Sequence, residues 1–317
     1  MVTPGNGIGN NTNNVASQKE EEQEGITKVH LERLQSVLDR FEVTIAEAND
    51  LVALEDYRIV LICDDSGSMQ RPAVPPHLRR LGEESTTRWQ ELQSTASLMV
   101  ELGCCFDIAG VDVYFLNRPR VPRVQGANDS RFLDALKAVP TGKTPLTSTI
   151  GQVVAECQGE RPVLLLILTD GVPDGGPRQF IELVRDVVHK RTSTTTFKFQ
   201  VMACTPEEDE IAWLNKLDAE LPQVDVTDDY CTERDQVLKA KHTSTFTRGD
   251  WVLKAMLGPI SHKFDLWDER KNKSELQKLL SGASAYCNWL ASCCTSTGAC
   301  ELPWSESIGT PNSKPKF

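Results

Sequence analysis

The chain has 317 residues, of which 39% are hydrophobic and 25% are charged, a composition typical of a soluble globular protein. Its formal net charge is −11, so it lacks the surplus of lysine and arginine with which proteins contact nucleic-acid phosphates. Residues 1–15 carry neither the basic start nor the apolar run of a secretory signal, and no stretch reaches the ~20 apolar residues of a membrane helix. We therefore expect no nucleic-acid partner, no signal peptide and no transmembrane segment.

Residues 1–25 are rich in asparagine, glycine and serine and include an acidic run, which predicts a disordered leader. Over residues 26–56 we expect an amphipathic N-terminal helix that packs on the following domain, because apolar residues recur there at helical spacing. These residues are Leu31, Leu34, Leu38, Phe41 and Ile45.

Short apolar runs rich in β-branched residues predict the strands of a sheet that is buried on both faces. In chain order they occupy residues 57–63, 111–116, 163–168, 197–203 and 224–226. The run at 163–168 is the most apolar in the chain, so we expect it to be an interior strand.

Helical patterns separate these runs. Thr87 and Gln90 have the spacing of a capping box at the start of the first helix. Thr144 and Pro145 mark the start of the second, with Thr144 as its N-cap. Further helices are expected at residues 180–188, around 211–217 and from about 233. This alternation predicts an α/β fold over residues 57–241, with a doubly wound, mostly parallel central sheet flanked by helices.

The C-terminal part of the chain is expected to contain an extension and a tail. Residues 242–291 contain enough aromatic and aliphatic side chains to dock back on the domain, and residues 274–290 have the apolar spacing of a final helix. Residues 292–317 are rich in serine, threonine, glycine and proline, which predicts disorder.

Three polar loops contain the candidate functional residues. They comprise residues 64–69, 142–146 and 169–171, and we place each of them after the carboxyl end of a predicted parallel strand. Open α/β sheets bind their ligands at this edge, so we expect the three loops to converge in space.

Together the three loops resemble the metal-ion-dependent adhesion site of von Willebrand factor A (VWA) domains. That site has the pattern Asp-x-Ser-x-Ser on one loop, a threonine on a second loop and an aspartate on a third. The matching residues here are Asp64, Ser66, Ser68, Thr144 and Asp170. The resemblance covers residues 57–241 and implies a VWA fold whose bound metal captures an Asp or Glu carboxylate of a partner protein. It also implies that the serines bind the metal directly and that the aspartates often act through water.

The donor chemistry of the loops indicates the kind of ion. Carboxylate and hydroxyl oxygens are hard ligands suited to Mg²⁺, or to Mn²⁺ or Ca²⁺, whereas the thiolates and imidazoles that favour zinc or iron are absent from these loops. Thr144 is expected to face a competition between metal contact and helix capping. Asp65 and Asp174 lie beside the site and are candidates for a partner-binding rim, with solvation in a loop as the alternative.

We expect a binding module in an intracellular assembly and no catalytic residues, because no nucleophile or acid and base set stands out. The 10 cysteines include Cys63 and Cys204 in runs that predict buried strands, where a free thiol behaves as a small apolar group. We therefore expect a reducing, cytoplasmic location. Three alternatives stay open: a hydrolase or transferase that uses the ion as a Lewis acid, a secreted adhesion protein with bridged cysteines, and a scaffold with an empty site.

Overall fold

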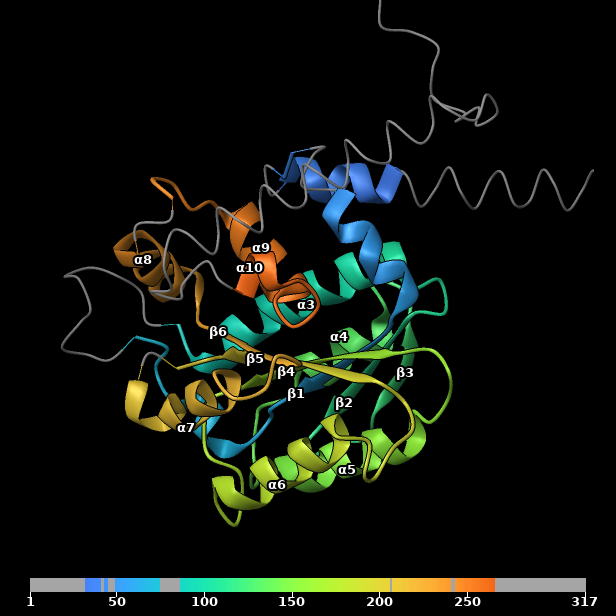
Figure 1. Ribbon diagram of the computed structural model, residues 1–317, viewed down its shortest axis with the longest axis vertical. Helices are drawn as coiled ribbons and strands as arrows, with labels where there is room; N and C mark the ends of the chain where they lie inside the picture. The colour runs from blue at the N-terminus through green and yellow to red at the C-terminus, as the bar shows by residue number, and fades with distance from the viewer. Residues whose placement is uncertain are drawn as a thin grey trace, which may run out of the picture. The chain divides into compact units, whose positions relative to one another are not determined.

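The computed structural model describes residues 32–40, 43–44, 49–74, 86–205, 207–240 and 243–265. These residues form an α/β fold with strands β1 (Arg58–Cys63), β2 (Val111–Phe115), β3 (Val121–Val124), β4 (Val163–Thr169), β5 (Phe197–Ala203) and β6 (Val224–Thr227). The strands make one six-stranded sheet in the order β3-β2-β1-β4-β5-β6 (Figure 1). β3 pairs antiparallel with β2, and the other neighbouring strands pair parallel.

Helices flank the sheet on both faces. The helices are α3 (Arg88–Phe106), α4 (Ser130–Lys137), α5 (Leu146–Glu156), α6 (Pro177–Val188), α7 (Glu208–Asp218), α8 (Tyr230–Ala240), α9 (Arg248–Leu257) and α10 (His262–Asp265), with 3-10 turns η1 (Val52–Asp56) and η2 (Gly67–Gln70). In Figure 1, α5 and α6 cover one face of the sheet, and α3 and α9 lie on the other. Residues 32–40 are also helical.

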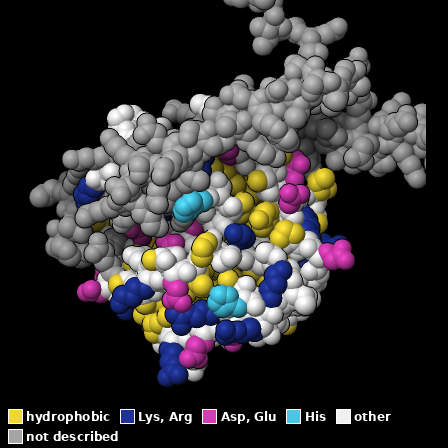
Figure 2. Space-filling model, viewed as in Figure 1, with side chains coloured by type: hydrophobic (Ala, Val, Ile, Leu, Met, Phe, Trp, Pro, Cys, Tyr) yellow, Lys and Arg dark blue, Asp and Glu magenta, His cyan; other side chains and the backbone are white. Residues whose placement is uncertain are grey.

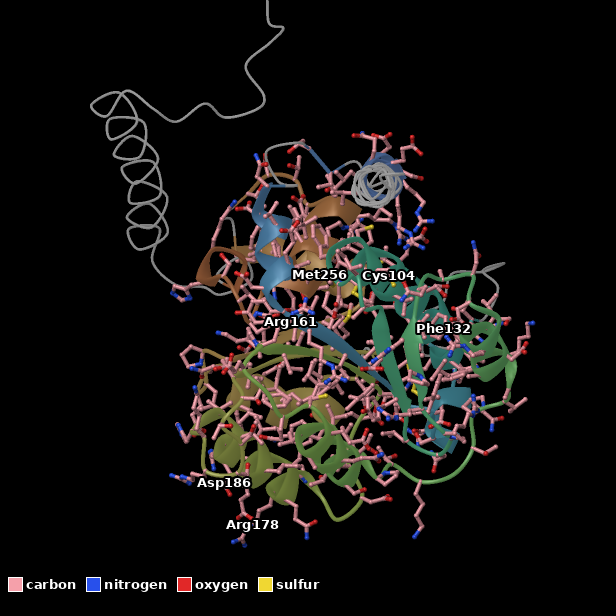
Figure 3. The ribbon with its side chains drawn as sticks, turned by 90° about the vertical axis from the view of Figure 1, so that its right-hand side faces the viewer. Cys104, Phe132, Arg161, Arg178, Asp186 and Met256 are labelled. Atoms are coloured by element: carbon pink, nitrogen blue, oxygen red, sulfur yellow. The ribbon has the colours of Figure 1, made fainter. Side chains whose placement is uncertain are left out.

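Each face of the sheet has its own buried core. Alternate residues of β4 point to opposite faces, so Leu166 joins one apolar cluster and Ile167 joins the other. The first cluster includes the buried side chains of α3 and α9, and the second includes those of α5 and α6. Figure 3 shows Met256 of α9 and Cys104 of α3 inside the first layer, whereas Arg178 of α6 projects from the opposite side of the molecule.

The surface of the described residues mixes charges of both signs. On the face drawn in Figure 2, lysine and arginine side chains are interspersed with aspartate and glutamate side chains. None of the described helices combines the length and the apolar character needed to span a lipid bilayer.

The structure confirms the five predicted strands to within one residue at each end. The capping box of α3 is also confirmed: the Gln90 N–H donates to Thr87 Oγ1 at 3.2 Å, and the Thr87 N–H donates to Gln90 Oε1 at 2.8 Å. Of residues 26–56, where one helix is predicted, 32–40 and 49–51 are helical and η1 follows at Val52–Asp56, but residues 43–44 are not helical. The predicted leader at 1–25, the final helix at 274–290 and the tail at 292–317 lie outside the described residues.

The connection after β2 differs from the prediction. The predicted elements leave a long connection between the strand at 111–116 and the helix that starts at Thr144, and the structure places β3 and α4 in it. β3 is a four-residue edge strand that contains Pro122, a residue that counts against a strand when a sequence is read by propensity. Proline is tolerated because β3 is at the end of the sheet, where it pairs with β2 alone.

Glu91, in the first turn of α3, gives a pH-dependent prediction. Burial and then the negative charge of Asp229 raise the pKa of Glu91 from 4.5 to about 6, against a lowering by the Thr86 hydroxyl. A carboxyl whose pKa is raised on folding favours the folded state while it is protonated, and this contribution is lost as the pH rises from 4.5 through about 6.

We expect Glu91→Gln, which mimics the protonated form, to match the wild type near pH 4 and to be more stable by about 1 kcal/mol near pH 7.5, after allowance for solvent screening. Urea unfolding of both proteins at the two pH values checks this. A difference in stability that does not widen with pH contradicts it.

Candidate metal centre

The first and third loops leave neighbouring strands at the centre of the sheet. β1 and β4 are paired in parallel, with Cys63 opposite Leu168 at their carboxyl ends. The Asp64 N–H donates to the Leu168 carbonyl at 2.9 Å, which keeps the two chains together beyond the strand. The strand order reverses between β1 and β4, and in open α/β sheets this switch point is where ligands bind.

A chain of hydrogen bonds brings four of the predicted ligands together. Ser66 Oγ lies 2.9 Å from Ser68 Oγ, and Ser68 Oγ donates to Asp170 Oδ1 at 2.8 Å. Because the single hydroxyl proton of Ser68 goes to Asp170, Ser66 is the donor in the bond between the serines. Asp64 accepts from the Ser66 N–H at 2.9 Å and from Thr169 Oγ1 at 2.7 Å. The Asp-x-Ser-x-Ser segment and the third loop therefore form one connected group of oxygens.

The second loop reaches the site by backbone hydrogen bonds. The Gly67 N–H donates to the Gly142 carbonyl at 3.1 Å, and the Asp174 N–H donates to the Thr144 carbonyl at 2.8 Å. Gly142 has a φ of 99°, and a Cβ there would meet the side chain of Asn117, so glycine is required at this position. These bonds tie the second loop to the first loop at Gly142 and to the segment that follows the third loop at Thr144.

The origin of the second loop corrects one expectation. We placed this loop after a parallel strand, but it follows α4, because β2 leads into the edge strand β3 and then into that helix. It meets the other loops through the contacts just described and not through a strand end. The three loops therefore converge, although by different routes.

Thr144 does not cap the helix that follows it. α5 begins at Leu146, and its N-cap is Pro145, whose ψ of 43° lies outside the helical range. The predicted competition between capping and metal contact at Thr144 is therefore wrong. Its side chain is partly exposed, as is that of Ser68.

Most of the oxygens of the group are buried. Asp64 is 0% exposed, Ser66 1% and Asp170 3%. Burial is the main cause that raises the pKa of Asp64 to about 6, and the negative charge of Asp170 adds to it, while hydrogen bonds from Ser66 and Thr169 lower it. Two carboxylates close together in a buried setting make a strongly electronegative site. Such a site favours a positive charge.

Arg88 is a buried cation beside Asp170 that the sequence did not indicate. It is 1% exposed, and its Nη1 lies 2.9 Å from Asp170 Oδ2 and 3.0 Å from Glu210 Oε2. Its Nη2 lies 3.4 Å from Glu207. The sequence does contain one hint of this contact. Arg88 follows the predicted capping residue Thr87 and is the first residue of α3, where the helix dipole disfavours a positive charge, so an arginine there suggests acidic partners nearby.

The two rim candidates occupy very different places. Asp65 is 0% exposed: its carboxylate accepts from the Asn117 N–H at 2.8 Å and lies 3.0 Å from Arg118 Nε. Its side chain therefore points into the protein and ties the first loop to the residues that follow β2, where a partner does not reach it. Asp174 is exposed and stays at the edge of the site.

The donor set is consistent with a hard divalent cation. Its members offer hydroxyl and carboxylate oxygens, which suit Mg²⁺, Mn²⁺ and Ca²⁺. Within the described ranges, no three His, Cys, Asp or Glu side chains are grouped so as to hold a metal ion by themselves. A cation here would therefore depend on the serine hydroxyls as well as on Asp64 and Asp170.

Comparisons with known proteins do not add to this description. No protein-family model matches the chain, and no curated protein matches its sequence. The interpretation of the site therefore depends on its own residues and their geometry.

Proposed function

We propose that this chain is a protein-binding module of the VWA type, which holds a divalent cation and uses it to capture an acidic side chain of a partner. The cation is Mg²⁺, or Mn²⁺ or Ca²⁺, and its proposed ligands are Asp64, Ser66, Ser68, Thr144 and Asp170. The observation that carries the proposal is the hydrogen-bonded chain from Ser66 through Ser68 to Asp170, with Asp64 tied to the same segment.

The bonding of the serines suits this role. Ser66 donates its hydroxyl proton to Ser68, and Ser68 donates its own to Asp170. Each serine oxygen therefore keeps a lone pair that can bind a cation. The carboxylates of Asp64 and Asp170 supply negative charge. A bound divalent ion would supply a Lewis-acidic centre that attracts an oxygen anion.

Charge compensation favours an acidic partner. Arg88 offsets part of the charge of Asp170, so the two carboxylates do not fully neutralise a divalent ion. The remaining positive charge would attract a carboxylate. Ser68 and Thr144 are partly exposed, so a partner side chain can approach on their side of the site.

The state of the cysteines supports an intracellular location for such a module. Among the described residues, the cysteines are free thiols: Cys63, Cys104, Cys105, Cys157, Cys204 and Cys231. Bridged cysteines would be expected in a secreted adhesion protein. We therefore propose that the module acts in the cytoplasm.

The decisive test is metal binding by the wild type and by Ser68→Ala. Calorimetric titration with Mn²⁺ is expected to show binding by the wild type and affinity at least ~10-fold weaker for Ser68→Ala, because one ligand oxygen and the hydrogen bond to Asp170 are both lost. Mn²⁺ should raise the Tm of the wild type by mass action and have little effect on the variant.

Ser148→Ala is the matched control. Ser148 is exposed on α5 and donates to the Pro145 carbonyl, so the same substitution there should leave Mn²⁺ affinity unchanged. Equal Mn²⁺ responses in the wild type and Ser68→Ala would refute the proposed site. A pull-down with and without EDTA, using the same pair of proteins, then tests whether partner capture depends on the metal.

A further inference from the structure

Asp170 is held from two sides by groups of different character. Its Oδ1 accepts from the Ser68 hydroxyl, whereas its Oδ2 faces the guanidinium of Arg88 at 2.9 Å. The first contact belongs to the proposed ligand group. The second brings a full positive charge to the edge of a site that is proposed to bind a cation, and its effect on the affinity for that cation goes beyond the proposed function.

The same guanidinium nitrogen is shared with α7. Arg88 Nη1 donates both to Asp170 Oδ2 and to Glu210 Oε2, at 2.9 and 3.0 Å. Glu210 is fixed in turn by the hydroxyl of Thr205 at 2.9 Å and by Arg71 at 3.0 Å. Arg88 therefore lies between Asp170 of the candidate site and the carboxylates of Glu210 and, at 3.4 Å, Glu207 at the start of α7.

We propose that Arg88 is a positioning residue that holds Asp170 and weakens cation binding at the site, and that Glu210 limits this effect by drawing the guanidinium toward α7. This inference rests on the proposed function, because it concerns the affinity of the same site. If Arg88 and Glu210 act in this way, the acidic residues at the start of α7 help to determine the affinity of the site for the cation.

Electrostatics gives the direction of each effect. A unit charge within about 6 Å of a divalent ion changes affinity by about tenfold even when it is screened as in water. Arg88 both repels a cation and occupies an oxygen of Asp170, so its removal strengthens binding. Neutralising Glu210 leaves Arg88 closer in charge balance to Asp170, with only the more distant Glu207 on the side of α7, and it removes a nearby negative charge, so binding weakens.

A purely structural role for Arg88 would predict something else. A residue needed only to anchor the start of α3 would lower stability when replaced, without a directed change in metal affinity. A buried positive charge at a helix N-terminus is also an unfavourable choice for an anchor. If replacing Arg88 strengthens metal binding and replacing Glu210 weakens it, Arg88 modulates metal affinity and is not only a structural anchor.

The experiment is calorimetric titration of the full chain with Mn²⁺, together with the Tm measured with and without Mn²⁺. Arg88→Met is expected to bind Mn²⁺ about tenfold more tightly than the wild type, and to show a larger Mn²⁺-induced rise in Tm from a lower starting value. Glu210→Gln is expected to bind several-fold more weakly. Arg88→Lys keeps the charge and should stay within about threefold of the wild type. Glu220→Gln, which removes an exposed partner of Arg185, is the matched control and should not change affinity.

The outcomes separate this inference from the proposed function. No Mn²⁺ binding by the wild type would refute both. Binding by the wild type, with equal affinities in Arg88→Met and Glu210→Gln or with weaker binding in Arg88→Met, would leave the site standing and overturn the role of Arg88. If Arg88→Met does not fold, Glu210→Gln decides, and unchanged affinity in that variant overturns the inference.

Discussion

Replacing Lys254 by alanine is expected to lower the free energy of unfolding by about 3–5 kcal/mol, because it removes a buried cation from between buried carboxylates. Lys254 of α9 is 0% exposed, and its Nζ lies 3.4 Å from Asp225 Oδ1 and 3.5 Å from Glu233 Oε1. Both carboxylates are themselves 1% exposed. They come from β6 and α8, so the loss would loosen the attachment of α9 to the sheet.

Chemical denaturation of Lys254→Ala against Lys263→Ala measures the effect. Lys263 pairs with Asp50 at 2.7 Å, but both side chains are more than a third exposed, at 41% and 36%. The same substitution there should cost about 1 kcal/mol or less. Similar losses in the two variants would show that the buried cluster does not hold α9.

Replacing Gly258 by alanine should destabilise the protein by up to about 3 kcal/mol, because it overpacks the same interface. Gly258 is the C-cap of α9, and a Cβ there would collide with the buried carboxyl group of Asp225. Asp225 cannot move aside easily, since it accepts from Thr227 at 3.1 Å and faces Lys254. The added methyl group would therefore push α9 away from β6.

Gly151→Ala is the control, and there we expect alanine to increase the stability of the protein instead of lowering it. A Cβ at Gly151, in the middle of α5, meets no atom within 4 Å apart from its chain neighbours and the neighbouring backbone of its own helix. Alanine there should stabilise the protein by about 0.5–1 kcal/mol through its better helix propensity. Thermal unfolding of both variants checks the pair. A Gly258→Ala protein as stable as the wild type would mean that the contact between α9 and β6 is loose.

The central sheet could be predicted from the sequence because it is buried on both faces. β4 has no exposed residue, so its sequence is a continuous apolar run from Val163 to Leu168 that no helix or loop of this length would need. The start of α3 was equally clear, since Thr87 and Gln90 satisfy each other locally. Where a structural element is determined by residues that are close together in the sequence, the sequence pattern was sufficient to predict it.

The features that the sequence did not predict depend on contacts between residues that are far apart in the chain. β3 is a strand only because β2 offers it an edge, and its sequence has no apolar alternation of its own. Arg88 and Asp170 are 82 positions apart, and spacing along the chain does not reveal that one guanidinium joins the third loop to α7. For the same reason Asp65, adjacent to Asp64, could be assigned to an exposed rim, although it lies buried against Arg118.

The length of chain between the proposed ligands bears on when the site forms during folding. Ser68 and Asp170 are separated by 102 residues, so their hydrogen bond cannot form before β1 and β4 have paired. Closing so long a segment is a late and entropically costly event. A cation bound there would not guide the early steps of folding. It would stabilise only the completed sheet and so slow its opening, which makes the bound ion a determinant of the lifetime of the native state and not of the folding rate.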